Sequence, residues 1–307
     1  MKKLTAFLLA VLLVFCTGVF AVAEEDDETV AEMPPLKLPI DFSPGNVLNP
    51  KFFVSDTVYE DPTIKVVITA GDDKGRKYWI ADIEIADASQ LRTASAEGFD
   101  TNGTEFGTVL ARRMNAVVAV DGDYYCYAYN NPVHVTIRQG ITFENSLRPG
   151  KRGDNKNQDV LLIDEDGDFH GLEDPLAGDV GTEINGKKII NAFYFGPLLV
   201  NNGKVREKDP SHMKTNQFSQ RAAICQTGHL KYRIIVTGPH KRGSKAFQFY
   251  PWRKFVADME DIQVAYNLDG GDSAFLYFNN QRINDPLSTN DRNLSDIIYF
   301  ASAWPGA

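Results

Sequence analysis

Two polar stretches carry the residue types most capable of chemistry. The stretch Asn267-Leu-Asp-Gly-Gly-Asp-Ser273 places carboxylates, glycines and a hydroxyl between two apolar runs. Consecutive glycines such as Gly270 and Gly271 can turn successive backbone N–H groups toward one point, which suits an anion. The same residue types also form ordinary tight turns. Taken alone, this stretch is either a site or a turn.

The second stretch is Asp121-Gly122-Asp123, which follows the apolar run "NAVVAV". Two acids that flank a glycine at a strand end can bring both carboxylates near one point. Aspartate and glycine are also the residues that turns prefer, and for this stretch alone the turn is favoured.

Two further positions are unusual for their surroundings. Gly196 and Pro197 interrupt two apolar runs, although the Asn202-Gly203 that follows is a plain hairpin signal. Arg221 opens the apolar segment "RAAIC". A guanidinium is costly to bury without an anion, which could be a phosphate, a carboxylate or an internal aspartate.

Strand patterns dominate the rest of the chain. Short β-branched and aromatic runs bounded by turn residues recur from residue 63 to residue 302. Helical spacing of apolar residues occurs over 105–116 and 252–261. The sequence therefore predicts an α+β fold with an extensive mixed β-sheet and a few helices, in a single domain over residues 51–307.

The N-terminus predicts export. Lys2 and Lys3 precede an apolar run and the small residues around Ala23, which is typical of a signal peptide over residues 1–23. Residues 24–50 are acidic and then proline-rich, as in an arm or linker. No other stretch is long enough to span a membrane. The formal net charge of -9 argues against nucleic acid as a partner.

The cysteines leave one disulfide possible, whereas neither the acidic run at 164–168 nor the histidines form a metal-binding motif. Cys126 and Cys225 follow the signal peptide and could form one disulfide or two separate buried thiols. The run "DEDGD" at 164–168 resembles a calcium loop, but its glycine comes too early, and a hairpin turn at Asp166-Gly167 fits better. No histidine pair has the spacing of metal ligands.

Taken in order, these stretches resemble the phosphodiester glycosidase family. That family has an "NLDGG" loop with a following hydroxyl, an earlier strand end with aromatics, a "GP" before an apolar strand, and a strand that opens with arginine. The matching stretches here are 267–273, 122–125, 196–203 and 221–224. Asp121, Asp272, Ala274 and Cys225 depart from the family pattern.

The resemblance implies cleavage of a sugar-1-phosphodiester at the sugar side. The catalytic residues would be Asp269, Asp123 and Arg221. The carboxylates would activate water or stabilise an oxocarbenium-like sugar, and Arg221 would bind the phosphate. The residues that would bind the substrate are Asn267, Gly270, Gly271, Ser273, Asp121, Gly122 and Gly196.

The expected substrate is a phosphorylated glycan at the cell surface or outside the cell. Two alternatives stay open. The clustered aspartates could hold a divalent metal for attack at phosphorus, or the same scaffold could bind a glycan or the cell envelope without catalysis, which the departures at Asp121 and Asp272 would favour.

Overall fold

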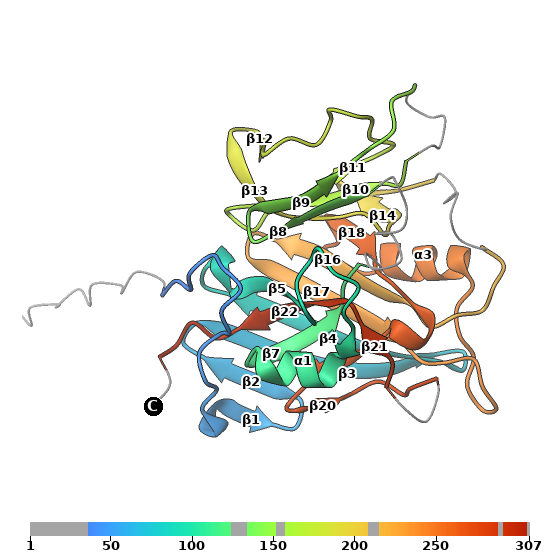
Figure 1. Ribbon diagram of the computed structural model, residues 1–307. Coiled ribbons are helices and arrows are strands. Elements are labelled where there is room, and N and C mark those ends of the chain that lie inside the picture. Colours follow the sequence, from blue (N-terminus) through green and yellow to red (C-terminus); the bar gives the residue numbers. More distant parts are fainter. Residues whose placement is uncertain (1–35, 124–133, 152–156, 208–214, 288–290, 306–307) are drawn as a thin grey trace, which may run out of the picture. The chain divides into compact units, whose positions relative to one another are not determined.

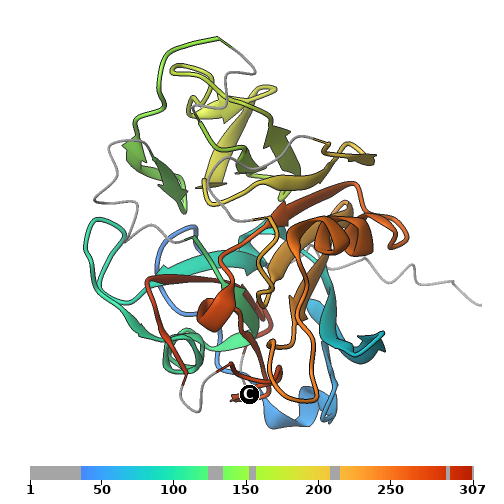
Figure 2. The ribbon, with the colours of Figure 1, turned by 90° about the vertical axis from the view of Figure 1, so that its right-hand side faces the viewer.

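Alternation of buried and exposed residues sets the strands, and strands dominate the fold (Figures 1 and 2). The computed structural model describes residues 36–123, 134–151, 157–207, 215–287 and 291–305. These residues belong to one compact unit that extends from position 35 to the C-terminus. Every strand pairing among them is antiparallel. The predicted sheet-rich fold with few helices is confirmed, and the antiparallel pairing refines the predicted mixed sheet.

The largest sheet has nine strands. In spatial order they are β1 (Phe53–Ser55), β2 (Val58–Asp61), β3 (Ile64–Asp73), β4 (Arg76–Ile85), β17 (Lys231–Thr237), β16 (Ala222–Gly228), β18 (Val264–Asn267), β14 (Leu198–Asn201) and β15 (Lys204–Val205). The β14–β15 hairpin has Asn202 and Gly203 at positive φ, so the hairpin predicted there is confirmed.

The second and third sheets carry the other long strands. The six-stranded sheet contains β11 (Phe169–Leu172), β10 (Val160–Asp164), β13 (Lys187–Phe193), β8 (Val135–Arg138), β9 (Ile141–Asn145) and β12 (Glu183–Ile184). The five-stranded sheet contains β20 (Gln281–Arg282), β19 (Leu276–Phe278), β7 (Ala116–Asp121), β22 (Asp296–Ala301) and β5 (Leu91–Ser95). A small pair joins β21 (Asn293–Leu294) to β6 (Glu105–Phe106).

Two α-helices and three 3₁₀ turns complete the described structure. They are α1 (Gly107–Arg113), α3 (Phe249–Ala257), η1 (Pro50–Phe52), η2 (Ala88–Gln90) and η3 (Gly271–Ser273). Both predicted helices are therefore confirmed. The buried face of α1 includes Leu110 and Ala111, whereas Phe106 and Val109 are exposed.

Three sheets share one hydrophobic core. Val66 of the nine-stranded sheet, Val118 of the five-stranded sheet and Leu161 of the six-stranded sheet belong to the same buried cluster. A second cluster joins α1 to the other face of the five-stranded sheet, and a third joins α3 to the other face of the nine-stranded sheet. Strands buried on both faces read as continuous apolar runs, which explains "AVVAV" in β7.

Part of the predicted arm packs against the domain. The guanidinium of Arg92 is fully buried and donates hydrogen bonds to the carbonyl oxygens of Pro39 (2.7 Å), Asp41 (2.9 Å) and Ser43 (2.9 Å). Leu38 lies in the cluster beneath α1. The ordered fold thus includes residues before position 51, because a buried cation requires these carbonyl groups.

Candidate active site

A pocket forms where the carboxyl end of β7 meets the beginning of β22. Its volume is about 100 Å³. The register of β7 with β22 pairs Asp121 with Ile297, so Asp296 lies next to Gly122. The residues that line the pocket are Thr104, Asp121, Gly122, Asp123, Asp269, Ser273, Arg292, Asn293, Leu294, Ser295 and Asp296.

Three aspartates that the sequence singled out therefore lie in one pocket. Asp121 and Asp123 come from the end of β7, and Asp269 comes from the loop between β18 and η3. Asp121 and Asp123 are buried, while Asp269 is half-buried. Asp269 is therefore the most accessible of the three to a bound molecule.

Arg138 holds two of the pocket's carboxylates. Its Nη2 lies 3.1 Å from Oδ2 of Asp296 and 3.4 Å from Oδ2 of Asp123. The guanidinium is fully buried and stacks over the ring of Phe193, with 4.1 Å to the ring centre. The backbone N–H of Tyr194 donates to Asp123 Oδ2 at 2.7 Å. The position of Asp123 is therefore set from two sides.

Burial raises the pKa of the other three carboxyl groups. The pKa of Asp296 rises to about 7 because the group is buried, although Arg138 opposes the rise. Burial and the neighbouring Asp269 hold the pKa of Asp121 well above its usual range. The pKa of Asp269 is raised by burial, against hydrogen bonds from Ser273 and the Gly270 amide. Raised carboxyl pKa values in a pocket are common in acid–base sites.

The backbone at Gly122 must approach Asp296 closely. A Cβ atom at position 122 would lie 2.6 Å from Oδ1 of Asp296. The Gly122 N–H also donates to the Asp296 carbonyl at 3.2 Å. Only glycine leaves room for the carboxylate at this point, which gives the predicted Gly122 a structural reason.

Asn267 connects the loop to Gly196. Its Nδ2 donates to the Gly196 carbonyl at 3.0 Å, and its Oδ1 accepts from Nε1 of Trp252 at 2.9 Å. Gly196 has φ of 62°, and a Cβ there would lie 3.2 Å from the Asp159 carbonyl. Asn267 and Gly196 therefore meet, but both lie outside the residues that line the pocket.

Gly270 and Gly271 pack against the chain at Arg221. The Gly271 N–H donates to the Gln220 carbonyl at 3.0 Å, and a Cβ at Gly270 would lie 2.7 Å from that oxygen. The Arg221 guanidinium donates to the Gln217 carbonyl at 3.2 Å, and burial lowers its pKa to about 10. Arg221 does not line the pocket. The structure thus brings Asp123 and Asp269 together without placing the Arg221 side chain beside them.

Residues 114–301 match the sequence profile of the phosphodiester glycosidase family. The chain belongs to the phosphodiester glycosidase family. The family resemblance of the four polar stretches is therefore confirmed. No curated protein has a sequence significantly similar to that of this chain.

Solved structures of similar fold include a catalytic domain from zebrafish. That structure is N-acetylglucosamine-1-phosphodiester alpha-N-acetylglucosaminidase auto-inhibited by its pro-peptide, with 17% identity, a TM-score of 0.61, and coverage of 84% of this chain and 87% of that chain. A hypothetical protein from Synechocystis matches at 15% identity and a TM-score of 0.51, over 80% of this chain and 64% of that one. Both structures share the fold of this chain.

Sequence patterns alone missed Arg138, Asp296 and Arg292. Arg138 ends the apolar run "VHVTIR", the same type of signal that drew attention to Arg221. Asp296 begins the apolar run "DIIYF". A charged residue at the edge of a buried strand is thus the sequence signal that both Arg138 and Asp296 share.

Several predicted features fall outside the described residues or the pocket. Cys126, Tyr124 and Tyr125 lie outside the described residues, as does the signal peptide. Cys225 is a buried free cysteine, and burial raises its pKa to about 12.

No helix in the described ranges is long and apolar enough to cross a membrane.

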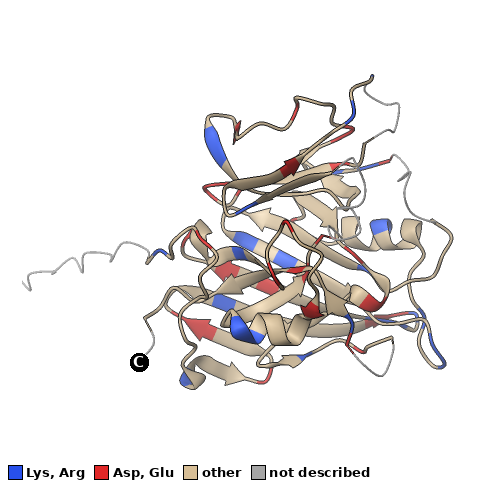
Figure 3. Ribbon diagram, viewed as in Figure 1, with Lys and Arg blue, Asp and Glu red and all other residues tan. Residues whose placement is uncertain are grey.

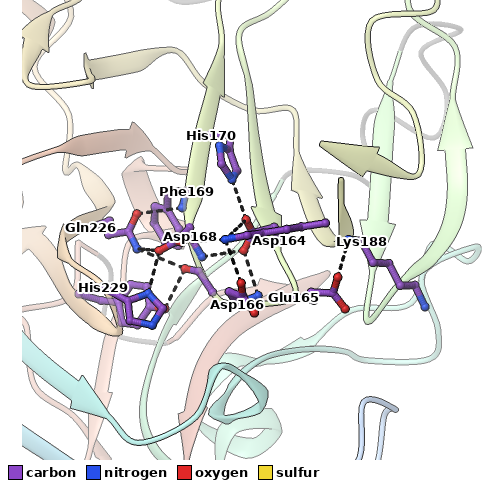
Figure 4. A network of polar contacts seen from close by, with 12 residues as sticks. Asp164, Glu165, Asp166, Asp168, Phe169, His170, Lys188, Gln226 and His229 are labelled. Atoms are coloured by element: carbon purple, nitrogen blue, oxygen red, sulfur yellow. Dashed lines mark hydrogen bonds and ion pairs between the residues drawn. The ribbon is translucent and has the colours of Figure 1, made fainter. Parts of the chain in front are cut away.

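The acidic run at 164–168 forms a separate polar network (Figure 4). The Gly167 N–H donates to the Asp164 carbonyl at 3.0 Å, so the predicted turn is confirmed. Lys187 pairs with Asp166 at 2.9 Å, and His229 contacts Asp168 at 3.1 Å. Within the described residues, no group of three acidic, histidine or cysteine side chains is placed to hold a metal ion. This network joins the β10–β11 and β16–β17 turns.

Proposed function

We propose that this phosphodiester glycosidase hydrolyses a sugar-1-phosphodiester in a cell-surface or extracellular glycan, after export by the N-terminal signal peptide. The observation that carries the proposal is the convergence of Asp121, Asp123 and Asp269, from two separate sequence stretches, on one pocket. Family membership supplies the reaction class.

Asp269 is the candidate for direct contact with the reacting atoms. It is half-buried, whereas Asp121 and Asp123 are buried, so a substrate reaches Asp269 first. Its raised pKa makes it a stronger base than an ordinary aspartate, which suits activation of water. The departing phosphate monoester has a second pKa of about 6, so it leaves readily without a strong general acid.

The remaining residues either position the carboxylates of Asp269 and Asp123 or bind the phosphate. Ser273 hydrogen-bonds to Asp269 and lines the same pocket. Arg138 and the Tyr194 amide fix Asp123. We assign phosphate binding to Arg221, whose guanidinium would have to turn from the Gln217 carbonyl toward the pocket. The N–H groups of Gly270 and Gly271 are already donated, to Asp269 Oδ1 and to the Gln220 carbonyl, so these glycines shape the loop and do not bind the phosphate.

Hydrolysis in ¹⁸O-labelled water tests the reaction. Attack at the anomeric carbon places the label in the released sugar, which is the expected outcome. Label in the phosphate product would instead show attack at phosphorus and would overturn the glycosidase assignment. Binding of a sugar-phosphodiester panel without release of any sugar would indicate a binding protein on the same scaffold.

A further inference from the structure

A basic surface lies on two loops that the proposed reaction does not use. We define it by Lys74 and Lys77 near the β3–β4 turn and by Lys241, Arg242 and Lys245 between β17 and α3. Figure 3 shows blue ribbon at the tip of the loop between β17 and α3. The two segments are joined by backbone hydrogen bonds from Lys245 to Gly75 (2.9 Å) and from Gly238 to Lys77 (2.8 Å).

Most of these cations have no acidic partner in the described part of the chain. Lys77 pairs with Asp285 at 3.1 Å. Lys74, Lys241, Arg242 and Lys245 are exposed, and no ion pair joins any of them to a described residue. The chain as a whole carries a net charge of -9. A local excess of positive charge on an acidic protein attracts anions to one place on its surface.

An aromatic pair borders this basic surface. Phe218 and His240 stack with ring centres 4.8 Å apart and an interplanar angle of 13°. Phe218 is 48% exposed, so part of its ring is open to solvent. His240 directly precedes Lys241 in the chain. An exposed aromatic ring beside cations can support an apolar stretch of a ligand whose charged groups lie nearby.

The same chain segment reaches the loop of the candidate active site. Gln220 accepts a hydrogen bond from the Gly271 N–H at 3.0 Å. The Ser219 hydroxyl oxygen lies 3.6 Å from the position of a Cβ at Gly271. Residues 218–220 therefore connect the glycine loop to the Phe218–His240 pair and to the basic surface.

We propose that the basic surface binds the anionic backbone of a phosphodiester-linked polymer whose attached sugar is the substrate of the candidate site. The proposal rests on the proposed function, because it names the larger molecule that carries the scissile bond. Several separate cations suit repeated phosphates better than one small phosphate, since each can neutralise a different charge along the polymer.

The test uses the full-length protein and poly(glycerol phosphate) without sugar substituents. The variant K241Q/R242Q/K245Q removes three cations of the basic surface, and K65Q/K204Q/K231Q removes three exposed lysines of β3, β15 and β17 that lie outside it. We expect the first variant to bind the polymer about tenfold more weakly at low salt, and its affinity to depend less on salt than that of the unmodified protein. The control should bind like the unmodified protein. Equal affinities of the two triple variants would overturn the proposal.

Two further measurements separate this surface from the active site. The K241Q/R242Q/K245Q variant should keep its kcat/KM for a small sugar-1-phosphodiester but show a raised KM for the sugar-bearing polymer. F218A should weaken polymer binding and leave hydrolysis of the small substrate unchanged. Failure of the small substrate to react in the unmodified protein would count against the proposed function and not against the surface. Tighter binding to phosphatidylglycerol vesicles than to the polymer would assign the surface to a membrane and overturn the polymer proposal.

Discussion

The Nη2 atom of Arg138 lies 3.1 Å from Oδ2 of Asp296, and neither side chain is accessible to solvent. The same guanidinium lies 3.4 Å from Asp123. Isolated buried charges are costly, so the cation and the two acids must be maintained together. This contact links the six-stranded sheet, which carries Arg138, to the five-stranded sheet, which carries Asp296.

Replacement of Arg138 by methionine should lower the free energy of unfolding by about 3–5 kcal/mol, since two buried carboxyl groups lose their cation. The pKa of Asp296 should rise further, because Arg138 holds it down. Chemical denaturation measures the loss. The matched control is Arg233→Met, whose ion pair with Asp82 is partly exposed and should contribute no more than about 1 kcal/mol. Similar losses in both variants would contradict this role of Arg138.

The raised pKa of Asp296 predicts a pH dependence of stability. In the folded protein this pKa is about 7, against 3.8 for an ordinary aspartate, so between these values the folded state holds a proton that the unfolded state has lost. Stability should therefore fall as pH rises from 3.8 to 7, by at most about 1.4 kcal/mol per pH unit from this group. Denaturation midpoints of Asp296→Asn should vary less with pH over this range. An unchanged slope would contradict the assignment.

The sequence predicted the pocket's aspartates better than it predicted their cations. Asp121, Asp123 and Asp269 follow apolar strands, and polar residues at strand ends can be recognised locally. The partners of Arg138 lie 15 and 158 positions away along the chain. Asp296 reaches Arg138 because β22 pairs with β7 and the five-stranded sheet packs against the six-stranded sheet that carries Arg138. Such long-range pairing has no local pattern in one sequence.

Strand alternation also explains the position of Arg221. Ala222 faces the core shared by three sheets, whereas Ala223 faces the cluster beneath α3. Because successive side chains point to opposite faces, Arg221 lies on the α3 side of the sheet with Ala223. A run of apolar residues buried on both faces hides this periodicity, so the sequence did not show which way the guanidinium would point.

Gly122→Ala should disturb the pocket by steric overlap. The new Cβ would lie 2.6 Å from the Asp296 carboxylate, so either the carboxylate or β7 must shift. We expect a loss of stability of about 1–3 kcal/mol together with reduced activity. Gly181→Ala is the control, since its Cβ would meet nothing closer than 3.8 Å. Thermal unfolding and activity of the two variants should differ clearly, and equal behaviour would show that the close approach is not required.

Ser273→Ala should change the pH profile of the reaction. The Ser273 hydrogen bond lowers the pKa of Asp269, so its removal should raise that pKa. If Asp269 acts as the base, the acid limb of the kcat/KM profile moves to higher pH. Activity should remain measurable at alkaline pH, where Asp269 is ionised in both proteins. A uniform loss of activity at every pH, with no movement of the limb, would indicate that Ser273 acts on the substrate instead.

Asp269→Asn tests the candidate base directly. An asparagine keeps the size of the side chain but cannot accept the proton from water, and a positioned base typically contributes about 10²–10⁴-fold to the rate. We therefore expect release of sugar from a sugar-1-phosphodiester to fall by that factor. Stability should be kept or increased, because burial raises the pKa of Asp269 and the charged form is unfavourable in the pocket. Asp258→Asn, at the exposed end of α3, removes one carboxylate elsewhere and should leave turnover unchanged. Near-normal turnover by a folded Asp269→Asn protein would assign the reaction to another carboxylate of the pocket, with buried Asp123 next to be replaced.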